Sequence, residues 1–415
     1  MKPRKIRRRS TGYRRSAFRR RTPILKIVGT VAALAVVVTA GFFAGKLLFG
    51  DSTPEVNGPT PSSTTTTTTV PSGSSSATTT TAPQTNGALS LSSVKAVVLS
   101  TDALKNTETL KTTLQAAKKA GFTGIVFDMK DAKGNVWFAA DGALAKEAQA
   151  VVEKPLTETE FKAVLALCQT EKMLAIPRMY GFLDATASKK LVSARIAISG
   201  SPTIDWLDDY AENGGKPWLN PYSPQAHSYL IELAKQLHEW GCTAMIFDGV
   251  QFPNRLDSLA DFGKSAYTSM SKLEVLQTFV KSLTDALAGC EISVCANGAA
   301  TIGENTAAYG GNPLSFGSRY VSPLLYPETL GSSLTVGTQT VTDPTGQPAA
   351  AVAAAYRLVN DRVKLLNNAA PKLLPWLTAD GATAAQVKEE IAALGGAPFV
   401  LYTENGTYDF TALQP

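Results

Sequence analysis

From residue 95 onward, short apolar segments alternate with longer segments whose apolar residues recur at helical spacing. This alternation is typical of a parallel sheet whose strands are connected by covering helices. Eight segments have the strand pattern: Lys95–Ser100, Thr123–Asp128, Met173–Pro177, Thr243–Asp248, Ile292–Asn297, Tyr320–Tyr326, Lys372–Leu377 and Phe399–Thr403. Helical spacing is found in Thr107–Ala120, Thr157–Glu171, Pro224–Trp240, Lys272–Leu287, Gln347–Asn367 and Ala384–Leu394.

Eight strands favour a closed (β/α)8 barrel, the TIM barrel, within residues 91–412. Strands that are mostly followed by helices close naturally into a barrel, which needs about 250 residues or more. A doubly wound open sheet seldom needs so many strands, and no Gly-rich dinucleotide fingerprint follows the first strand. We therefore expect an α/β fold whose functional site lies at the C-terminal ends of the strands.

The amino-terminal region combines a basic tail with an apolar segment. Residues 1–26 hold 12 Lys and Arg and no Asp or Glu, so the net charge of +6 becomes −6 for the rest of the chain. Residues 27–49 are long and apolar enough to cross a bilayer as one helix. The basic flank predicts a cytoplasmic tail and a single-pass cell-membrane anchor, with the C-terminal domain outside the cytoplasm. A cleaved signal peptide is the alternative, although its basic and apolar regions are usually shorter.

Residues 50–90 consist largely of Thr, Ser, Pro and Gly. Such a segment cannot bury enough apolar surface to offset the loss of chain entropy on folding. It predicts a disordered linker that tethers the barrel to the membrane and can hold it within or beyond a cell wall.

Two aspartates end apolar strands and are the first candidates for a site. Side-chain alternation places Asp128 on the same strand face as Val126, and Asp248 on the same face as Ile246. Both carboxylates then point into the barrel, and because their strands are both even-numbered they can share one layer. In the structural alternative, each carboxylate only caps the next loop by accepting hydrogen bonds from backbone N–H groups.

A series of motifs resembles a bacterial family of unknown function that is regarded as a glycoside-hydrolase-like TIM barrel. Residues 247–253 resemble the FDYVRFP signature of that family. Further matches, in order, are Asp128-Met129-Lys130-Asp131 with Gly134, Arg178 with Phe182-Leu183-Asp184, Trp218-Leu219-Asn220-Pro221, residues 321–327, and Pro375-Trp376-Leu377-Thr378. The resemblance covers about residues 94–410 and implies a barrel related to glycoside hydrolases.

The sequence departs from the family pattern at several of these positions. Gly249 stands where the family has Tyr, Gln251 where it has Arg, and Glu328 where it has Ser, while Thr378-Ala379-Asp380 replaces the usual Gln-Asp. Loss of the Arg removes a bidentate clamp for a carboxylate or a pair of hydroxyls. A divergent enzyme and a domain that has lost catalysis both fit these departures.

Glycoside hydrolysis needs two carboxyl groups, one ionised as base or nucleophile and one protonated as acid. Asp248 is the first candidate for the base or nucleophile, and its strand position resembles that of the nucleophile in retaining α-glycosidases. The acid candidates are Asp128, Glu328 and Asp380. The substrate-binding candidates are Arg178, Tyr180, Trp218, Tyr326 and Trp376. Arg178 can equally hold the Asp184 loop, and Trp376 can serve in packing.

The sequence offers no support for metal or cofactor chemistry. His227 and His238 lie eleven residues apart on one predicted helix, without the spacing of metal ligands. No G-x-S-x-G elbow indicates a serine hydrolase. The expected partner is a carbohydrate polymer rather than nucleic acid, and no pattern indicates an oligomeric state. Three functions remain: a glycosidase acting on cell-wall or extracellular polysaccharide, a catalytically inactive carbohydrate-binding barrel, and a structural wall protein.

Overall fold

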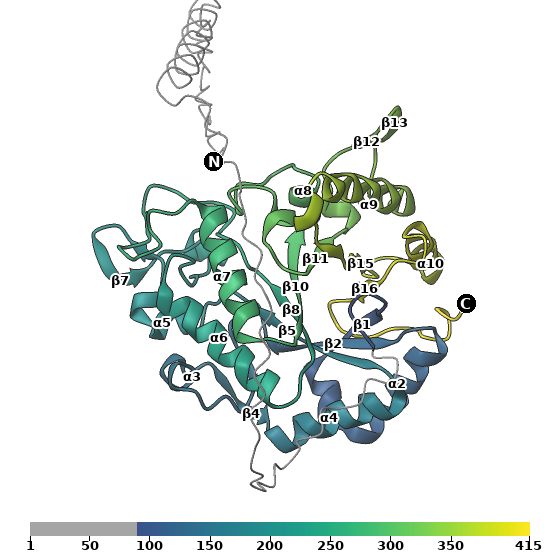
Figure 1. The fold of residues 1–415 in the computed structure, drawn as a ribbon, viewed down its shortest axis with the longest axis horizontal. Helices are drawn as coiled ribbons and strands as arrows, with labels where there is room; N and C mark the ends of the chain where they lie inside the picture. The colour runs from purple at the N-terminus through teal and green to yellow at the C-terminus, as the bar shows by residue number, and fades with distance from the viewer. Residues whose placement is uncertain (1–88) are drawn as a thin grey trace, which may run out of the picture. The chain divides into compact units, whose positions relative to one another are not determined.

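A computed structural model describes residues 89–415, and the predicted tail, membrane segment and almost all of the predicted linker lie outside the described residues. Eight parallel strand positions form a closed ring, because β1 pairs with both β2 and β16 (Figure 1). In ring order the strands are β1 (Lys95–Leu99), β2 (Gly124–Lys130), β5 (Leu174–Tyr180), β8 (Ala244–Asp248), β10 (Glu291–Asn297), β11 (Tyr320–Leu324), the pair β14 (Lys372–Leu373) and β15 (Trp376–Thr378), and β16 (Phe399–Tyr402). The predicted barrel is therefore confirmed.

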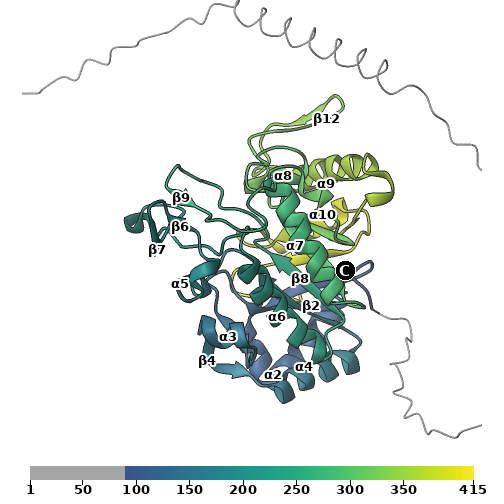
Figure 2. The ribbon, with the colours of Figure 1, turned by 60° about the vertical axis from the view of Figure 1, so that its left-hand side comes forward.

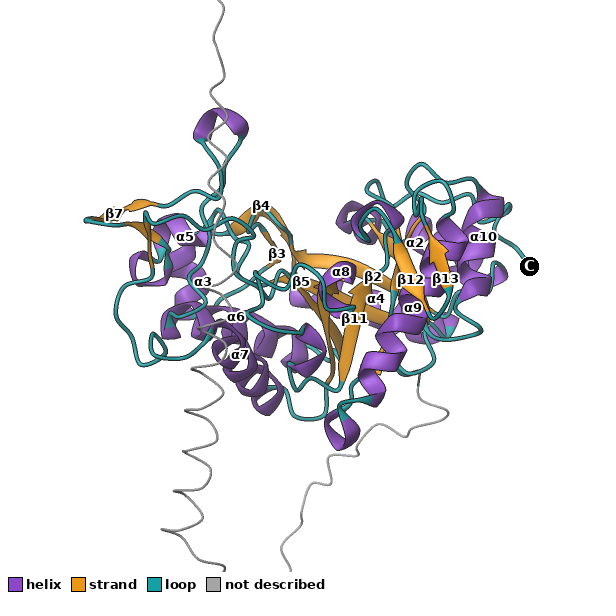
Figure 3. Ribbon diagram, turned by 90° about the horizontal axis from the view of Figure 1, so that it is seen from above, coloured by secondary structure: helices purple, strands orange, loops and turns teal. Residues whose placement is uncertain are grey.

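The long helices surround the strands (Figure 3). Each starts within one residue of its predicted amphipathic segment, and α4 begins with the capping box of Thr157 and Glu160 that its sequence predicts. The helices are α2 (Thr107–Lys119), α4 (Glu158–Glu171), α6 (Pro224–Glu239), α7 (Lys272–Ala286), α9 (Pro348–Lys364) and α10 (Ala384–Ala393). None of the helices in residues 89–415 combines the length and apolarity needed to cross a membrane.

The core has two parts, one inside the ring of strands and one between the strands and the helices. Inward-facing side chains fill the ring, including Val126, Ile246, Trp376 and Val400. Phe127 and Phe247, which alternate with inward residues, pack in the outer part with the helices. This alternation directs Asp128 and Asp248 toward the interior, as their strand positions predict.

Two strands differ from the sequence-based prediction around proline residues. The third strand continues through Pro177 to Tyr180, because a missing backbone N–H removes only one possible ladder bond. Arg178 and Tyr180 are consequently strand residues and not loop residues. The seventh strand is divided into β14 and β15, with Pro375 between them.

Loops at the C-terminal ends of the strands carry small additional elements. The connection after β2 contains β3 (Val136–Phe138), α3 (Ala143–Ala148) and β4 (Val151–Leu156). The loops after β5 and β8 together form a side lobe, which we define as residues 181–223 and 249–271 (Figure 2). The lobe contains α5 (Ala187–Lys190), β6 (Ala197–Ile198), β7 (Ser201–Asp205) and β9 (Ala260–Asp261), and a hairpin of β12 (Leu334–Val336) and β13 (Gln339–Val341) follows β11.

The amino-terminal pole of the barrel is closed by the first described residues. Leu91 is fully buried among the residues that fill the ring. Glu291, the first residue of β10, accepts hydrogen bonds from the Leu91 backbone N–H at 2.7 Å and from the Ser90 hydroxyl at 2.9 Å. The chain thus enters the barrel at the pole opposite the C-terminal strand ends.

Candidate active site at the barrel mouth

Three charged side chains meet where adjacent strands β2, β5 and β8 end. Asp128 lies directly beside Arg178 in the register of β2 and β5, and Asp248 lies beside Tyr180 in the register of β5 and β8. Arg178 is 5% exposed, so its charge depends on neighbouring carboxylates for compensation. The barrel therefore brings together two of the predicted catalytic residues and the predicted clamp.

Arg178 bridges the two aspartates. Its Nε and Nη2 donate to the two carboxylate oxygens of Asp128 at 2.5 and 3.0 Å, a bidentate pair. Its Nη1 lies 3.7 Å from Asp248 Oδ2. Because one guanidinium contacts both carboxylates, the two carboxyl groups lie on either side of Arg178 at the mouth, and glycosidases likewise use two neighbouring carboxyl groups.

The two carboxylates occupy different environments. The Asp128 side chain is 26% exposed and bound on both oxygens, whereas the Asp248 side chain is 15% exposed. Burial raises the pKa of Asp248, and this effect is opposed by Arg178 and by the backbone N–H of Gly249, which donates to Asp248 Oδ1 at 2.7 Å. Different environments shift the pKa values of two paired carboxyl groups apart, so that one can act as the acid and the other as the base.

Aromatic rings surround the guanidinium. The Arg178 Cζ atom lies 5.0 Å from the ring centroid of Tyr180, 5.1 Å from that of Trp376 and 5.7 Å from that of Tyr402. Tyr326 stacks on Tyr402 with ring centroids 6.0 Å apart. These contacts hold Arg178 by cation–π attraction. The partly exposed rings of Tyr180, Tyr326 and Tyr402 give the mouth flat apolar surfaces on which the C–H faces of a sugar can pack.

Hydrogen bonds of the Tyr309 hydroxyl fix the side chain of Gln251, in the loop that follows β8. The Tyr309 hydroxyl accepts from the Asn297 backbone N–H at 3.0 Å and donates to Gln251 Oε1 at 2.8 Å. This bond sets the orientation of the Gln251 amide, which stands where the resembled family has Arg. Burial raises the pKa of Tyr309, and the negative charge of Asp248 adds to this effect. Gln251 follows Asp248 by three residues along the chain.

Sequence reasoning missed three residues of the mouth. Tyr402 ends β16 on the same strand face as Val400, so the parity argument used for the aspartates was sufficient to find it. Asn297 similarly ends β10. Tyr309 lies in a loop, and no periodicity in the sequence connects it with Gln251.

Two predicted acid candidates lie on the rim and are not part of the charged group. Glu328 and Asp380 are both exposed, and within the described residues Arg178 forms ion pairs with Asp128 and Asp248 alone. Asp380 accepts from the backbone N–H of Glu404 at 2.9 Å, so it caps a loop. The rim position follows from their sequence: both residues lie past the strand end, where alternation no longer directs a side chain inward.

Trp218, a predicted substrate-binding residue, lies in the side lobe. It is 5% exposed, and its indole N–H donates to Asp208 Oδ2 at 2.8 Å. The side chain is thus engaged in packing the lobe, and we do not retain it among the mouth residues. Trp376 is fully buried in the core inside the ring, so it packs beneath Arg178, and the packing alternative holds for it. The other aromatic candidates, Tyr180 and Tyr326, are partly exposed at the mouth.

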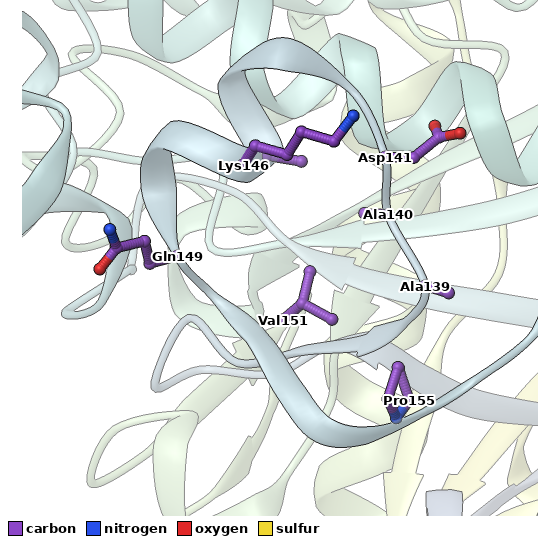
Figure 4. Close-up of a pocket in the computed structure, with 8 residues that line it drawn as sticks. Ala139, Ala140, Asp141, Lys146, Gln149, Val151 and Pro155 are labelled. Atoms are coloured by element: carbon purple, nitrogen blue, oxygen red, sulfur yellow. The ribbon is translucent and has the colours of Figure 1, made fainter.

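A cavity of about 490 Å³ lies away from the mouth, between β3, α3 and β4 (Figure 4). Its lining is largely Ala139, Ala140, Ala145, Val151 and Pro155, together with Asp141, Lys146 and Gln149. A single carboxylate among alanines offers no acid–base pair, so the mouth is the better candidate for catalysis.

The fold and this group of residues define a (β/α)8 barrel with a paired-carboxylate mouth. The profile of the family described as "Putative glycosyl hydrolase domain" matches residues 96–395, and the chain belongs to this family. This confirms the resemblance that the sequence motifs indicated. No curated protein matches the chain.

The chain is also similar to solved structures, of which we give three. A hypothetical protein from Ruminiclostridium thermocellum ATCC 27405 is 24% identical, with 48% of this chain and 96% of that chain covered and a TM-score of 0.41. A mutant β-hexosaminidase from Streptomyces plicatus with the product GlcNAc is 11% identical, with 78% and 60% covered and a TM-score of 0.42. The catalytic domain of β-amylase from Paenibacillus polymyxa is 9% identical, with 78% and 95% covered and a TM-score of 0.47.

Proposed function

We propose that the chain is a glycoside hydrolase that uses Asp248 and Asp128 on cell-wall or extracellular polysaccharide. Membership of the family described as "Putative glycosyl hydrolase domain" supports the reaction class. The observation that carries the proposal is the pair of inward carboxylates in unlike environments, bridged by Arg178 and surrounded by aromatic rings. This arrangement has the two carboxyl groups that glycosidic bond cleavage requires.

The environments favour a particular division of roles. Asp248 is the more buried carboxyl and its pKa is raised by that burial, so it is suited to hold a proton and give it to the glycosidic oxygen as the C–O bond breaks. Asp128, bound bidentately by Arg178, is suited to act as the anion that attacks the anomeric carbon or removes a proton from the attacking water. The strand position alone ranked Asp248 first as nucleophile or base.

A carbohydrate-binding barrel without catalysis is the second candidate. One observation favours it: Arg178 contacts both carboxylates, and Asp128 has both oxygens engaged. In such a protein the same charged group would orient a glycan through hydrogen bonds. Cleavage would then be absent although the mouth still bound sugar.

Glycan-array binding followed by product analysis distinguishes the two candidates. The hydrolase proposal predicts that a bound polysaccharide is converted to shorter chains with new reducing ends. Binding with no product on prolonged incubation would support the second candidate. A chain that binds no glycan on the array and releases no product would contradict both.

We also propose that residues 27–49 anchor the protein in the cell membrane, with the barrel outside the cytoplasm. The support is the sequence pattern of a basic flank followed by a long apolar run. Residues 50–88 then supply the tether. An extracytoplasmic barrel would have access to wall or extracellular polysaccharide.

A further inference from the structure

One arc of the mouth has carboxylates without compensating cations. The loops that follow the adjacent strands β11, β15 and β16 comprise residues 325–347, 379–383 and 403–409. These segments contain no Lys, Arg or His. Their acidic residues are Glu328, Asp343, Asp380, Glu404 and Asp409. By contrast, the loops after β2, β5 and β8 mix both signs of charge.

Within residues 89–415, none of these five carboxylates forms an ion pair. Arg178, whose Cζ lies 5.7 Å from the Tyr402 ring centroid, is already engaged by Asp128 and Asp248. The next cations along the chain, Arg357 and Lys388, lie at least one helical turn down α9 and α10. With Asp248 protonated as the proposed acid, Asp128 and Arg178 balance each other, so the excess negative charge is that of the arc.

The rim carboxylates act on the same ring that borders the charged group. Burial raises the pKa of Tyr402, and Asp380 and Glu404 add to this effect while Arg178 opposes it. The Tyr402 carbonyl accepts from the backbone N–H of Ala379, next to Asp380, at 2.8 Å, and the Tyr402 ring centroid lies 5.7 Å from Arg178 Cζ, so Tyr402 adjoins both the rim and the mouth. A ligand that packs on Tyr402 and Tyr326 comes within reach of both groups.

We propose that the mouth binds a basic glycan, a polymer of sugars that carry free amino groups, and excludes acidic ones. The inference rests on the proposed function and assigns its substrate class. A cleft lined by one sign of charge concentrates ligands of the opposite sign. The protonated amines of such a glycan supply the cations that the arc lacks, and the aromatic rings accept the sugar faces. Gln251, a neutral residue, adds hydrogen bonding without a positive charge that would oppose the amine.

Three matched oligosaccharides test this substrate class on the full-length chain. They are a glucosamine oligomer, its N-acetylated and therefore neutral counterpart, and a uronic acid oligomer of equal length. Calorimetry at about pH 6, where the amines are protonated, should rank their affinities in that order. Raising the salt concentration should weaken binding of the glucosamine oligomer and leave the neutral oligomer unchanged, because screening acts on charges.

A charge-neutralised variant tests the arc itself. Glu328→Gln, Asp380→Asn and Glu404→Gln together should lower affinity for the glucosamine oligomer about five- to tenfold, as expected for three exposed charges, and leave the neutral oligomer unaffected. The control combines Glu239→Gln, Asp285→Asn and Glu389→Gln, exposed carboxylates on the outer helices α6, α7 and α10. It changes the net charge equally and should alter neither affinity.

The outcomes separate this inference from the proposed function. Equal affinity for the amino and neutral oligomers, or tighter binding of the uronic acid oligomer, would overturn the basic-glycan assignment and leave the hydrolase proposal in place. An equal loss in the control variant would also overturn it, since the effect would then be one of net charge. Absence of binding to all three oligomers, and to every glycan of the array, would contradict the proposed function as well.

Discussion

At the scale of single residues, a further carboxyl group, that of Glu390, is buried outside the mouth. Glu390 on α10 is 2% exposed, and its Oε2 has no hydrogen-bond partner within the described residues. Burial, followed by repulsion from Glu328, raises the pKa of Glu390 from 4.5 to about 7. The group is thus neutral in the folded chain at a pH where it is ionised in the unfolded chain.

This shift predicts a pH dependence of stability. The folded chain binds the proton of Glu390 more tightly than the unfolded chain does. The contribution of Glu390 to the unfolding free energy is therefore complete below pH 4.5 and is lost as pH rises through about 7. Glu390→Gln should therefore gain about 2–3 kcal/mol of unfolding free energy relative to wild type between pH 4 and pH 8. Urea denaturation at the two pH values measures this difference. The exposed neighbour variant Glu389→Gln should show none, and an equal effect of both variants would refute the assignment.

At the scale of elements, a buried ion pair ties the ends of β2 and β5 together. Lys130 Nζ lies 2.9 Å from Asp184 Oδ2, with both side chains fully buried, and it donates to the Tyr180 carbonyl at 2.7 Å. Asp184 Oδ1 accepts from the backbone N–H groups of Thr186 and Ala187 at 2.9 and 2.7 Å. The pair therefore fixes the strand end that carries Arg178 and the start of the side lobe.

Removing one partner should be costly, because the other charge stays buried. Lys130→Met should lower the unfolding free energy by about 3–5 kcal/mol, and adding Asp184→Asn should recover much of this loss. The exposed pair of Lys281 and Asp285 provides the control, since Lys281→Met should cost at most about 1 kcal/mol. Chemical denaturation of the four proteins decides the matter. No recovery in the double variant would show that Lys130 acts through packing alone.

Strands and helices were predictable from the sequence where apolar residues recur at a short, regular spacing. Period-two alternation was sufficient to place Asp128 and Asp248 inside the barrel, and the spacing of apolar residues located the six long helices. Contacts between distant residues had no such signal. Lys130 and Asp184 both stood in recognised motifs, yet their pairing depends on the register of β2 and β5. Trp218 was misplaced because the lobe that buries it has no regular repeat.

At the scale of the whole molecule, the barrel has two unlike poles. Leu91, Ser90 and Glu291 close the amino-terminal pole, whereas Asp128, Arg178 and Asp248 lie at the opposite mouth. The proposed anchor predicts that the protein fractionates with membranes. Protease added to wall-stripped cells should release the barrel by cutting between Asp51 and Gly87. A soluble secreted product that begins near residue 45 would show instead that the apolar segment is a cleaved signal.

The measurement that bears most directly on the hydrolase proposal is turnover by Asp248→Asn, using the glycan identified by the array and an aryl glycoside of the same sugar. We expect turnover of the glycan to fall by 10²–10⁴-fold, because its leaving group needs the proton. The aryl glycoside, whose leaving group departs without one, should lose much less. Glycan binding and the circular dichroism spectrum should match the wild type. Retention of more than about a tenth of wild-type turnover on the glycan would contradict a catalytic role for Asp248.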